Sequence, residues 1–355
     1  MPERILVCMS GGVDSTVAAF LLKEQGNYVQ GITFWFWSFP GAPDYASQIE
    51  DTSVTAASLA AEKLGIEHRV VDASDRFYDL VIRDFVDRYR SGETPNPCGR
   101  CNRMLRFGLA LEIAIKEGFD RISTGHHARI LPCEEDHLCL YRGADSAKDQ
   151  SYFLYGLREE TLSRLAFPVG QMSKEEVQAI ATRHGLSSMV QSESQDLCFA
   201  QAGKTDFLFT DEDSEPGPIL DMQGNHLGEH QGLFRYTIGQ RRGLKLVASQ
   251  PLYVVSIDRR TNTLTVGPEE ALYSSGLLAE EASYVSDELP EDDSALSAKL
   301  RYRSPSVSAA YKRFSADSFS LHFEKSQRAV TPGQIAALYH GERLLGGGII
   351  RKPLG

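Results

Sequence analysis

Up to about residue 200, short apolar runs alternate with helical stretches, and this pattern restricts the fold more than any other feature of the chain. The runs expected to form strands are residues 5–9, 28–37, 66–73 and 121–130. The stretches expected to form helices are residues 16–25, 53–65 and 105–118. This alternation predicts an α/β fold, with a parallel sheet covered by helices on both faces. Ligands bind such sheets at the carboxyl ends of the strands, where residues 10–15 and 123–127 are expected to lie.

The remainder of the chain has a different composition. From about Thr205 it is rich in Gly, Pro and acidic residues, and residues 239–245 (GQRRGLK) form a basic turn. After Pro251, short apolar runs are spaced by turn residues, which favours a small antiparallel barrel or sandwich. A chain of 355 residues is long enough for two or three domains. The expected domains are an α/β domain at 1–204, a small connecting domain at 205–270 and a C-terminal antiparallel β-barrel at 271–355.

Composition narrows the functional classes. The formal net charge of -11 argues against a general polyanion binder, although basic residues gathered on one face still allow a nucleic acid partner. No apolar run approaches the ~20 residues of a membrane span, so no membrane contact is expected. The six cysteines are too sparse for a disulfide scaffold, which favours a reducing cytoplasm. Cys8, Cys133 and Cys139 are expected in packing or at the surface.

Residues 10–15 (SGGVDS) follow the first expected strand and open a helix. Gly11 and Gly12 leave backbone N–H groups accessible, Ser10 and Ser15 add hydroxyl donors, and a helix N-terminus attracts anions. These features predict a phosphate site, with Asp14 bridged to the phosphates by Mg²⁺. The alternative is a glycine turn capped by Asp14.

The loop lacks both common nucleotide-binding fingerprints, G-x-x-x-x-G-K-S/T and G-x-G-x-x-G. It resembles instead the pyrophosphatase loop of the PP-loop ATPases, which split ATP into AMP and pyrophosphate. Such an enzyme adenylates a carbonyl oxygen, so that ammonia, an amine or sulfur can displace AMP. The loop leaves the choice of nucleophile open.

Cysteines point to sulfur as that nucleophile. Cys98 and Cys101 form a C-x-x-C just before a helix expected to start near Asn102, and Cys198 lies far downstream. A cysteine at a helix start near Arg100 and Arg103 is expected to be a thiolate at neutral pH. The alternatives for the pair are a structural zinc knuckle or buried small hydrophobes.

A series of motifs now identifies a family resemblance. In chain order they are SGGVDS, TPNP with CN, TGHxAR, KDQSYFL, SQDLCF, GEHQGL, GQRRGL, TPGQ and GGGII. Together they resemble the tRNA-specific 2-thiouridylases over nearly the whole chain, from Met9 to Ile350. The resemblance implies ATP-dependent exchange of the O2 oxygen of the wobble uridine for sulfur. It also implies a PP-loop domain, a central domain and a C-terminal β-barrel.

The resemblance also implies roles for individual residues. The ATP contacts would be Met9, Ser10, Gly11, Gly12, Val13, Asp14, Ser15, Phe34 and Gly125. Cys101 would be the nucleophile and Cys198 the persulfide carrier. The residues against the target base would be Asn96, Pro97 and Cys98. The other tRNA contacts would be His126, Lys148, Asp149, Gln150, Arg301, Tyr302 and Gln334. From the residues alone, Arg301 and Arg303 are expected on one face of a strand.

Cys98 departs from the family pattern, which commonly has an aspartate there. Three thiols, Cys98, Cys101 and Cys198, open two routes for sulfur. They could hold a 4Fe–4S cluster that passes on a sulfide, or Cys198 could deliver persulfide sulfur and form a disulfide with Cys101. The sulfur donor would be a cysteine desulfurase, a sulfur-relay protein or free sulfide.

Two further departures concern the nucleotide side of the site. The segment at residues 35–40 (WFWSFP) differs from the family pattern, and His127 replaces a tyrosine and is expected to pack. Two other functions stay open: a PP-loop ligase that uses ammonia, and a non-catalytic zinc- or RNA-binding protein.

Overall fold

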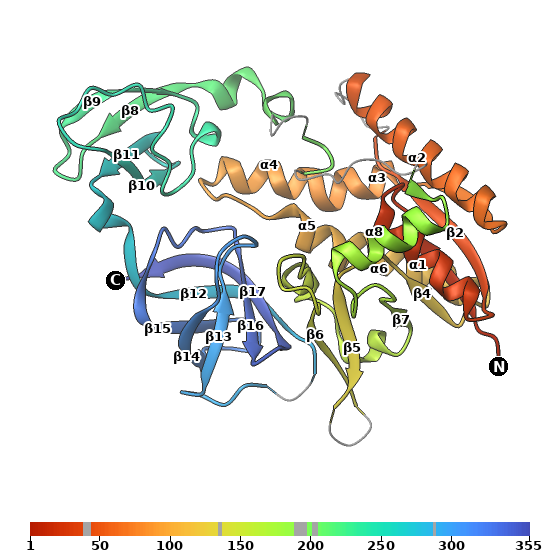
Figure 1. Ribbon diagram of the computed structural model, residues 1–355. Coiled ribbons are helices and arrows are strands. Elements are labelled where there is room, and N and C mark those ends of the chain that lie inside the picture. The colour runs from red at the N-terminus through yellow and green to blue at the C-terminus, as the bar shows by residue number, and fades with distance from the viewer. Residues whose placement is uncertain (38–43, 134–136, 188–196, 201–204, 287–288) are drawn as a thin grey trace.

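The computed structural model describes residues 1–355 except 38–43, 134–136, 188–196, 201–204 and 287–288 (Figure 1). Its first part is a parallel sheet with the strand order β3-β2-β1-β4-β7. The strands are β1 (Arg4–Cys8), β2 (Tyr28–Trp35), β3 (Glu67–Asp72), β4 (Arg121–Ser123) and β7 (Leu165–Ala166). The main helices are α1 (Val13–Glu24), α2 (Asp44–Leu64), α4 (Arg83–Arg90), α6 (Phe107–Lys116) and α8 (Lys174–Arg183). None of the described helices is long and apolar enough to cross a bilayer.

Helices cover both faces of this sheet, as the sequence predicts. Side chains alternate along β1 because a strand has a period of two. Ile5 and Val7 pack into a core with α1, α2 and α8. Leu6 points to the opposite core, which includes Phe107 and Leu109 of α6.

Residues 121–130 were expected to form one strand, and this prediction is wrong. The chain leaves the parallel sheet after β4, turns through Thr124–His127, and starts β5 (Ala128–Pro132). β5 pairs antiparallel with β6 (Leu138–Arg142), and β6 pairs with β17 (Arg343–Leu354) of the C-terminal domain. Residues 121–130 therefore contribute one strand to each of two sheets. The polar turn between these strands faces the carboxyl end of β1.

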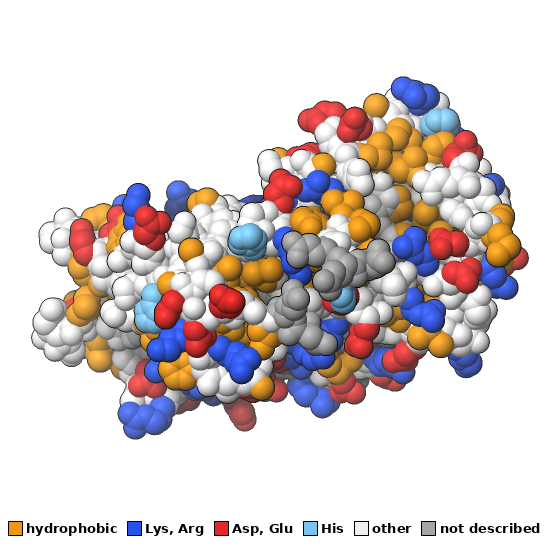
Figure 2. Space-filling view, turned by 90° about the horizontal axis from the view of Figure 1, so that it is seen from below, with side chains coloured by type: hydrophobic (Ala, Val, Ile, Leu, Met, Phe, Trp, Pro, Cys, Tyr) orange, Lys and Arg blue, Asp and Glu red, His pale blue; other side chains and the backbone are white. Residues whose placement is uncertain are grey.

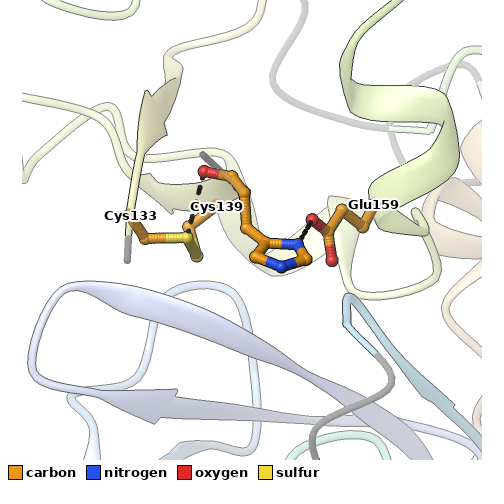
Figure 3. Close-up of a disulfide and its surroundings, with 4 residues drawn as sticks. Cys133, Cys139 and Glu159 are labelled. Carbon is orange, nitrogen blue, oxygen red and sulfur yellow. Dashed lines mark hydrogen bonds and ion pairs between the residues drawn. A yellow bond between two sulfur atoms is a disulfide. The ribbon is translucent and has the colours of Figure 1, made fainter. Parts of the chain in front are cut away.

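A disulfide between Cys133 and Cys139 closes the β5–β6 hairpin (Figure 3). The expectation that these two cysteines only pack or lie at the surface is therefore wrong. The antiparallel register that brings the hairpin ends together also places the two sulfur atoms side by side. Beside the disulfide, His137 contacts the Glu159 carboxylate at the start of α7 (Glu159–Leu162).

The helix expected to start near Asn102 instead begins at Pro97 and is built from three segments. Helix α5 (Pro97–Arg100) begins with proline at its first position, where a missing N–H costs nothing. A π-helical turn, η2 (Cys101–Arg106), follows and leads into α6. The other short helical segments are α3 (Ser74–Phe77), η1 (Tyr78–Ile82), η4 (Ser151–Leu154), η6 (Asp206–Leu208), η7 (Asp211–Ser214), η8 (Leu233–Arg235) and η9 (Glu269–Leu272).

The middle part is a small sheet with the order β10-β11-β8-β9. Its strands are β8 (Pro216–Leu220), β9 (His226–Gln231), β10 (Tyr253–Asp258) and β11 (Thr263–Gly267). Ile219, Val254 and Leu264 contribute to its separate apolar core. Arg90 of α4 forms two hydrogen bonds of 2.8 Å with the Asp213 carboxylate, which ties this part to the first.

The last part is a closed antiparallel barrel, as expected. Its strands follow the order β12-β15-β14-β13-β16-β17, and β12 also pairs with β17. The new strands are β12 (Tyr273–Tyr284), β13 (Ala295–Lys299), β14 (Val307–Arg313), β15 (Phe319–Arg328) and β16 (Ile335–His340). Arg301 and Arg303 lie in the turn after β13, so the expectation of a strand there is wrong. The guanidinium of Arg301 instead donates to the Ala329 carbonyl and the Thr331 hydroxyl.

Candidate active site

The loop at Ser10–Ser15 has the geometry of an anion cradle. Gly11 has a φ of +73°, and a Cβ there would lie 2.4 Å from the Ser53 carbonyl oxygen, so this position requires glycine. Gly12 is the N-cap of α1. The Ser15 hydroxyl accepts from the Ser10 N–H at 3.2 Å and donates to the Gly12 carbonyl at 3.0 Å. These bonds hold the loop open over the positive end of the helix dipole.

Asp14 has a cationic partner that the sequence analysis missed. Lys174 Nζ lies 2.8 Å from both carboxylate oxygens, and His127 Nε2 lies 3.4 Å from Oδ1. Burial alone raises the pKa of Asp14, but His127 and Lys174 outweigh burial and lower it. Since Lys174 engages the carboxylate, Asp14 as arranged does not present a free ligand for Mg²⁺. Lys174 is the first residue of α8. It belongs to none of the motifs found in the sequence, so its contact with Asp14 was not predicted.

The turn at Thr124–His127 closes over the loop. A Cβ at Gly125 would lie 2.5 Å from the Asp14 carbonyl carbon and from the Ser15 nitrogen, so only glycine permits this approach. Met9 and Phe34 are both buried, and they belong to cores on opposite faces of the sheet. The Phe34 ring lies 6.3 Å from that of Phe36. Its side chain therefore packs inward, and the expected adenine contact through it stays a prediction.

The free cysteines gather around one arginine. They are Cys8, Cys98, Cys101 and Cys198, of which Cys101 is buried and Cys198 exposed. Burial by itself lowers the pKa of Arg106, but the charges of Cys101, Cys198, Cys8 and Cys98 raise it. Cys8 ends β1, directly before the phosphate loop. The thiols therefore lie beside the nucleotide loop.

The surroundings of Cys98 and Cys101 favour the neutral thiol, so the expected thiolate at the C-x-x-C is wrong. Burial raises the pKa of Cys101, and it raises the pKa of Cys98 to about 12, with the Cys101 charge adding to the effect. Arg106 lowers both pKa values, but by less than burial raises them. A four-residue helix start offers too little field to reverse the cost of burial.

The two arginines beside the C-x-x-C face away from the thiols. Arg100 donates to the Leu80 carbonyl at 2.6 Å and lies 3.5 Å from the Asp84 carboxylate. Arg103 packs against Gly156, where an added Cβ would meet its side chain at 2.5 Å. With the period of an α-helix, residue 105 shares the face of residue 101 and residue 106 does not. The sequence pattern therefore did not predict that Arg106 lies beside Cys101.

His126 lies inside the protein rather than at an RNA-facing surface. Its Nδ1 is 2.7 Å from the Thr124 hydroxyl, and its Nε2 is 3.4 Å from the amide nitrogen of Asn102. Burial, followed by the charge of Arg106, lowers the pKa of His126 to about 3. A neutral His126 thus links the turn over the phosphate loop to η2, which carries the nucleophile Cys101 expected from the sequence.

Several residues expected to contact tRNA have structural partners. Asp149 is buried and accepts from the N–H groups of Gly143 and Ser151, and Gln150 accepts from the N–H of His127. The Tyr302 ring lies 4.5 Å from that of Phe153. On the face drawn in Figure 2, basic side chains are interspersed with acidic ones. Among the expected contacts, the buried His126 and Asp149 do not face solvent.

The TPGQ motif of the barrel holds the segment that leads into the C-x-x-C. Thr94 N–H donates to the Pro332 carbonyl at 2.9 Å, and Gln334 Nε2 donates to the Thr94 carbonyl at 2.7 Å. Next to this contact lies a cavity of about 190 Å³ that Asn96 helps to line. Asn96 Oδ1 is buried and has no hydrogen-bond partner within the described part of the chain.

The expected iron–sulfur ligands do not form a metal site in this structure. Within the described ranges, no group of three or more His, Cys, Asp and Glu side chains is close enough to hold a metal ion. The charged group among the thiols of Cys98, Cys101 and Cys198 is instead the Arg106 guanidinium. The residues as arranged therefore do not fit the cluster.

Family models match the chain in three consecutive stretches. They are described as tRNA methyl transferase HUP domain (residues 3–202), tRNA methyl transferase PRC-barrel domain (residues 205–268) and aminomethyltransferase beta-barrel domain (residues 274–350). The domain limits expected from the sequence stay predictions.

Curated relatives match over nearly the full length. The tRNA-specific 2-thiouridylase MnmA of Geobacter metallireducens is 41% identical over 358 residues, which cover 98% of this chain and 96% of the relative. The chain belongs to the tRNA-specific 2-thiouridylase family. The 2-thiouridylase of Pelobacter propionicus is 42% identical over 99% of this chain and 98% of its own length. That of Natranaerobius thermophilus is 41% identical over the same two shares. The family resemblance drawn from the motifs is thereby confirmed.

Proposed function

We propose that the chain catalyses the ATP-dependent 2-thiolation of the wobble uridine of tRNA. Support comes from its family and from one observation about the site. Cys8, Cys98, Cys101 and Cys198 gather around Arg106 directly beside the phosphate loop. A ligase that uses ammonia, or a protein that only binds RNA, has no use for this juxtaposition of thiols and a nucleotide loop.

In the first half-reaction the uridine O2 attacks the α-phosphate of ATP, and pyrophosphate leaves. The N–H groups at Gly11 and Gly12 would bind the phosphates, and the N-terminus of α1 would stabilise their charge. Lys174 would turn from Asp14 to a phosphate oxygen, or Mg²⁺ would replace it at the carboxylate. The product is an O2-adenylated uridine, whose C2 now carries AMP as a leaving group.

In the second half-reaction sulfur replaces the oxygen. The terminal sulfur of a Cys198 persulfide attacks C2, and AMP leaves with the original oxygen. Cys101 then attacks the inner sulfur, which breaks the S–S bond to the base and forms a Cys101–Cys198 disulfide. The base keeps the terminal sulfur as 2-thiouridine. A dithiol reductant must supply two electrons to restore both thiols.

This route needs no cluster. Sulfur would arrive as a persulfide from a cysteine desulfurase or a sulfur-relay protein, or as sulfide with an oxidant. Since Cys198 is exposed, a donor protein can reach it. The residues left to contact tRNA are Lys148, Gln150, Arg301, Tyr302 and Gln334. A cytoplasmic location is part of this proposal.

The test measures AMP release and 2-thiouridine formation with ATP, bulk tRNA and a persulfide donor. We expect tRNA to stimulate AMP release, and we expect Cys101→Ser to abolish thiolation while the protein stays folded. Asp14→Asn should slow AMP release by at least tenfold. Arg76→Met, which changes an exposed residue outside the site, serves as the control. Normal thiolation by Cys101→Ser, or AMP release that depends on ammonia and ignores tRNA, would contradict the proposal.

A further inference from the structure

A π-helical turn sets the relation between Cys101 and Arg106. In η2 the backbone bonds run from residue i to residue i+5, as in the N–H of Phe107 that donates to the Asn102 carbonyl. Residues five apart are therefore neighbours on one face, which an α-helix would separate. π-Helical turns are rare and occur frequently at functional sites. Here the turn brings a guanidinium to the same side of the helix as the Cys101 sulfur.

The surroundings of Arg106 are unusual for an arginine that is only half exposed. Among the described residues it forms no ion pair with a carboxylate, whereas Arg100 on the preceding turn pairs with Asp84. Its titratable neighbours are the thiols of Cys8, Cys98, Cys101 and Cys198. Half-buried charges in proteins usually have a partner of opposite sign. Within the described ranges, a partner of opposite sign arises only when one of these sulfur atoms becomes anionic.

We propose that Arg106 is a positioning residue that stabilises sulfur anions, both thiolates and the terminal sulfur of a persulfide, at this site. The proposal rests on the proposed function and names the group that makes its sulfur chemistry possible. Arg106 itself forms no covalent bond. Its role follows from a permanent positive charge, because a guanidinium does not lose its proton in a protein.

The reaction needs such a charge because burial disfavours every anion that the site must form. Burial raises the pKa of Cys98 and of Cys8 to about 12, and only Arg106 acts in the opposite direction on both. A cation within reach lowers a thiol pKa by about 1 to 3 units in typical cases. One arginine shared by the thiols can stabilise whichever sulfur carries the negative charge at each step.

The experiment compares Arg106→Met and Arg106→Gln with Arg106→Lys. Iodoacetamide labelling of Cys101 and Cys198 is followed by peptide mass spectrometry across a pH series, because alkylation reports the thiolate. We expect the labelling midpoint to rise by about 1 unit or more in the Met and Gln variants. In the Lys variant, the labelling midpoint should be close to that of the wild type. Arg76→Met is the control, since it removes one exposed arginine that pairs only with Glu112 in the described structure.

Thiolation is measured in parallel and should fall at least tenfold in the Gln variant and less in the Lys variant. Labelling midpoints that are the same in wild type, Gln and Lys variants would overturn the role of Arg106. If the Met variant does not fold, the Gln and Lys variants decide the question alone. Because labelling requires neither ATP nor tRNA, its outcome stays readable even if wild-type protein thiolates nothing.

Discussion

At the scale of single residues, His126 has a different role in the structure from the one expected from the sequence. In the sequence it stands in a polar motif and was expected to contact RNA. In the structure it is buried, with Phe107 and Phe167 within 6 Å of its ring centre. Burial lowers its pKa to about 3, so the folded protein holds it neutral. The nearby cation that contributes to this shift is Arg106, which the sequence pattern had not marked.

The pKa of His126 predicts an acid sensitivity. The unfolded chain binds this proton near pH 6.5, but the folded chain binds it only near pH 3, so stability falls as the pH drops between these values. His126 should cost the wild type about 2 kcal/mol between pH 7.5 and pH 5. Urea unfolding of wild type and His126→Gln at both pH values checks this. The variant should lose less stability on acidification, and His340→Gln, at an exposed site, should behave as wild type.

At the scale of elements, the hairpin β5–β6 connects the two larger parts of the molecule. It starts directly after the turn over the phosphate loop and continues the sheet of the barrel through β17. Its sequence contains only a weak strand pattern, and its partner strand lies two hundred residues downstream. Local propensity cannot reveal such a pairing, because the partner supplies the stabilising contacts.

The Cys133–Cys139 disulfide should be present in the purified protein. We expect iodoacetamide to label Cys198 in non-reduced protein and to leave Cys133 and Cys139 unlabelled until a reductant is added. Cys133→Ser should lower the stability of the hairpin by about 2 kcal/mol, because the closed loop restricts the unfolded chain. A thermal scan of the variant and of reduced wild type should show the same decrease. Full labelling of all cysteines without reductant would contradict this prediction.

At the scale of the whole molecule, the barrel controls the approach to the cysteines. The turn at Thr331–Gln334 hydrogen-bonds to Thr94 and Asn96, and Asn96 directly precedes the helix that carries Cys98. Gly333 has a φ of +89°, and a Cβ there would lie 2.9 Å from the Thr94 carbonyl carbon. Two motifs more than two hundred residues apart thus form one contact. The middle domain adds a hydrogen bond of 3.2 Å from Thr94 to Thr237.

Gly333→Ala should therefore disturb the site from a distance. The methyl group meets the Thr94–Pro95 backbone, and the residue adopts a left-handed conformation that costs alanine about 1 kcal/mol. Gly341→Ala is a matched control, because its φ is +57° but nothing lies within 4 Å of the added Cβ. We expect a larger fall in the thermal midpoint and in the thiolation rate for Gly333→Ala. Equal effects of the two substitutions would show that the contact does not position the cysteines.

The sequence alone determined the α/β class and the β-rich end, and it predicted the phosphate loop and the reactive cysteines. These features depend on periodicity and on short motifs, in which neighbouring residues carry the information. The tertiary structure alone decided which charges face those cysteines and what holds the loop before them. Lys174 and Gly333 lie on segments that are far along the chain and pack against the site. Arg106 lies near the cysteines because its helical turn is a π-turn. Burial then set the protonation of the thiols, because the cost of removing a charge from water depends on the whole fold.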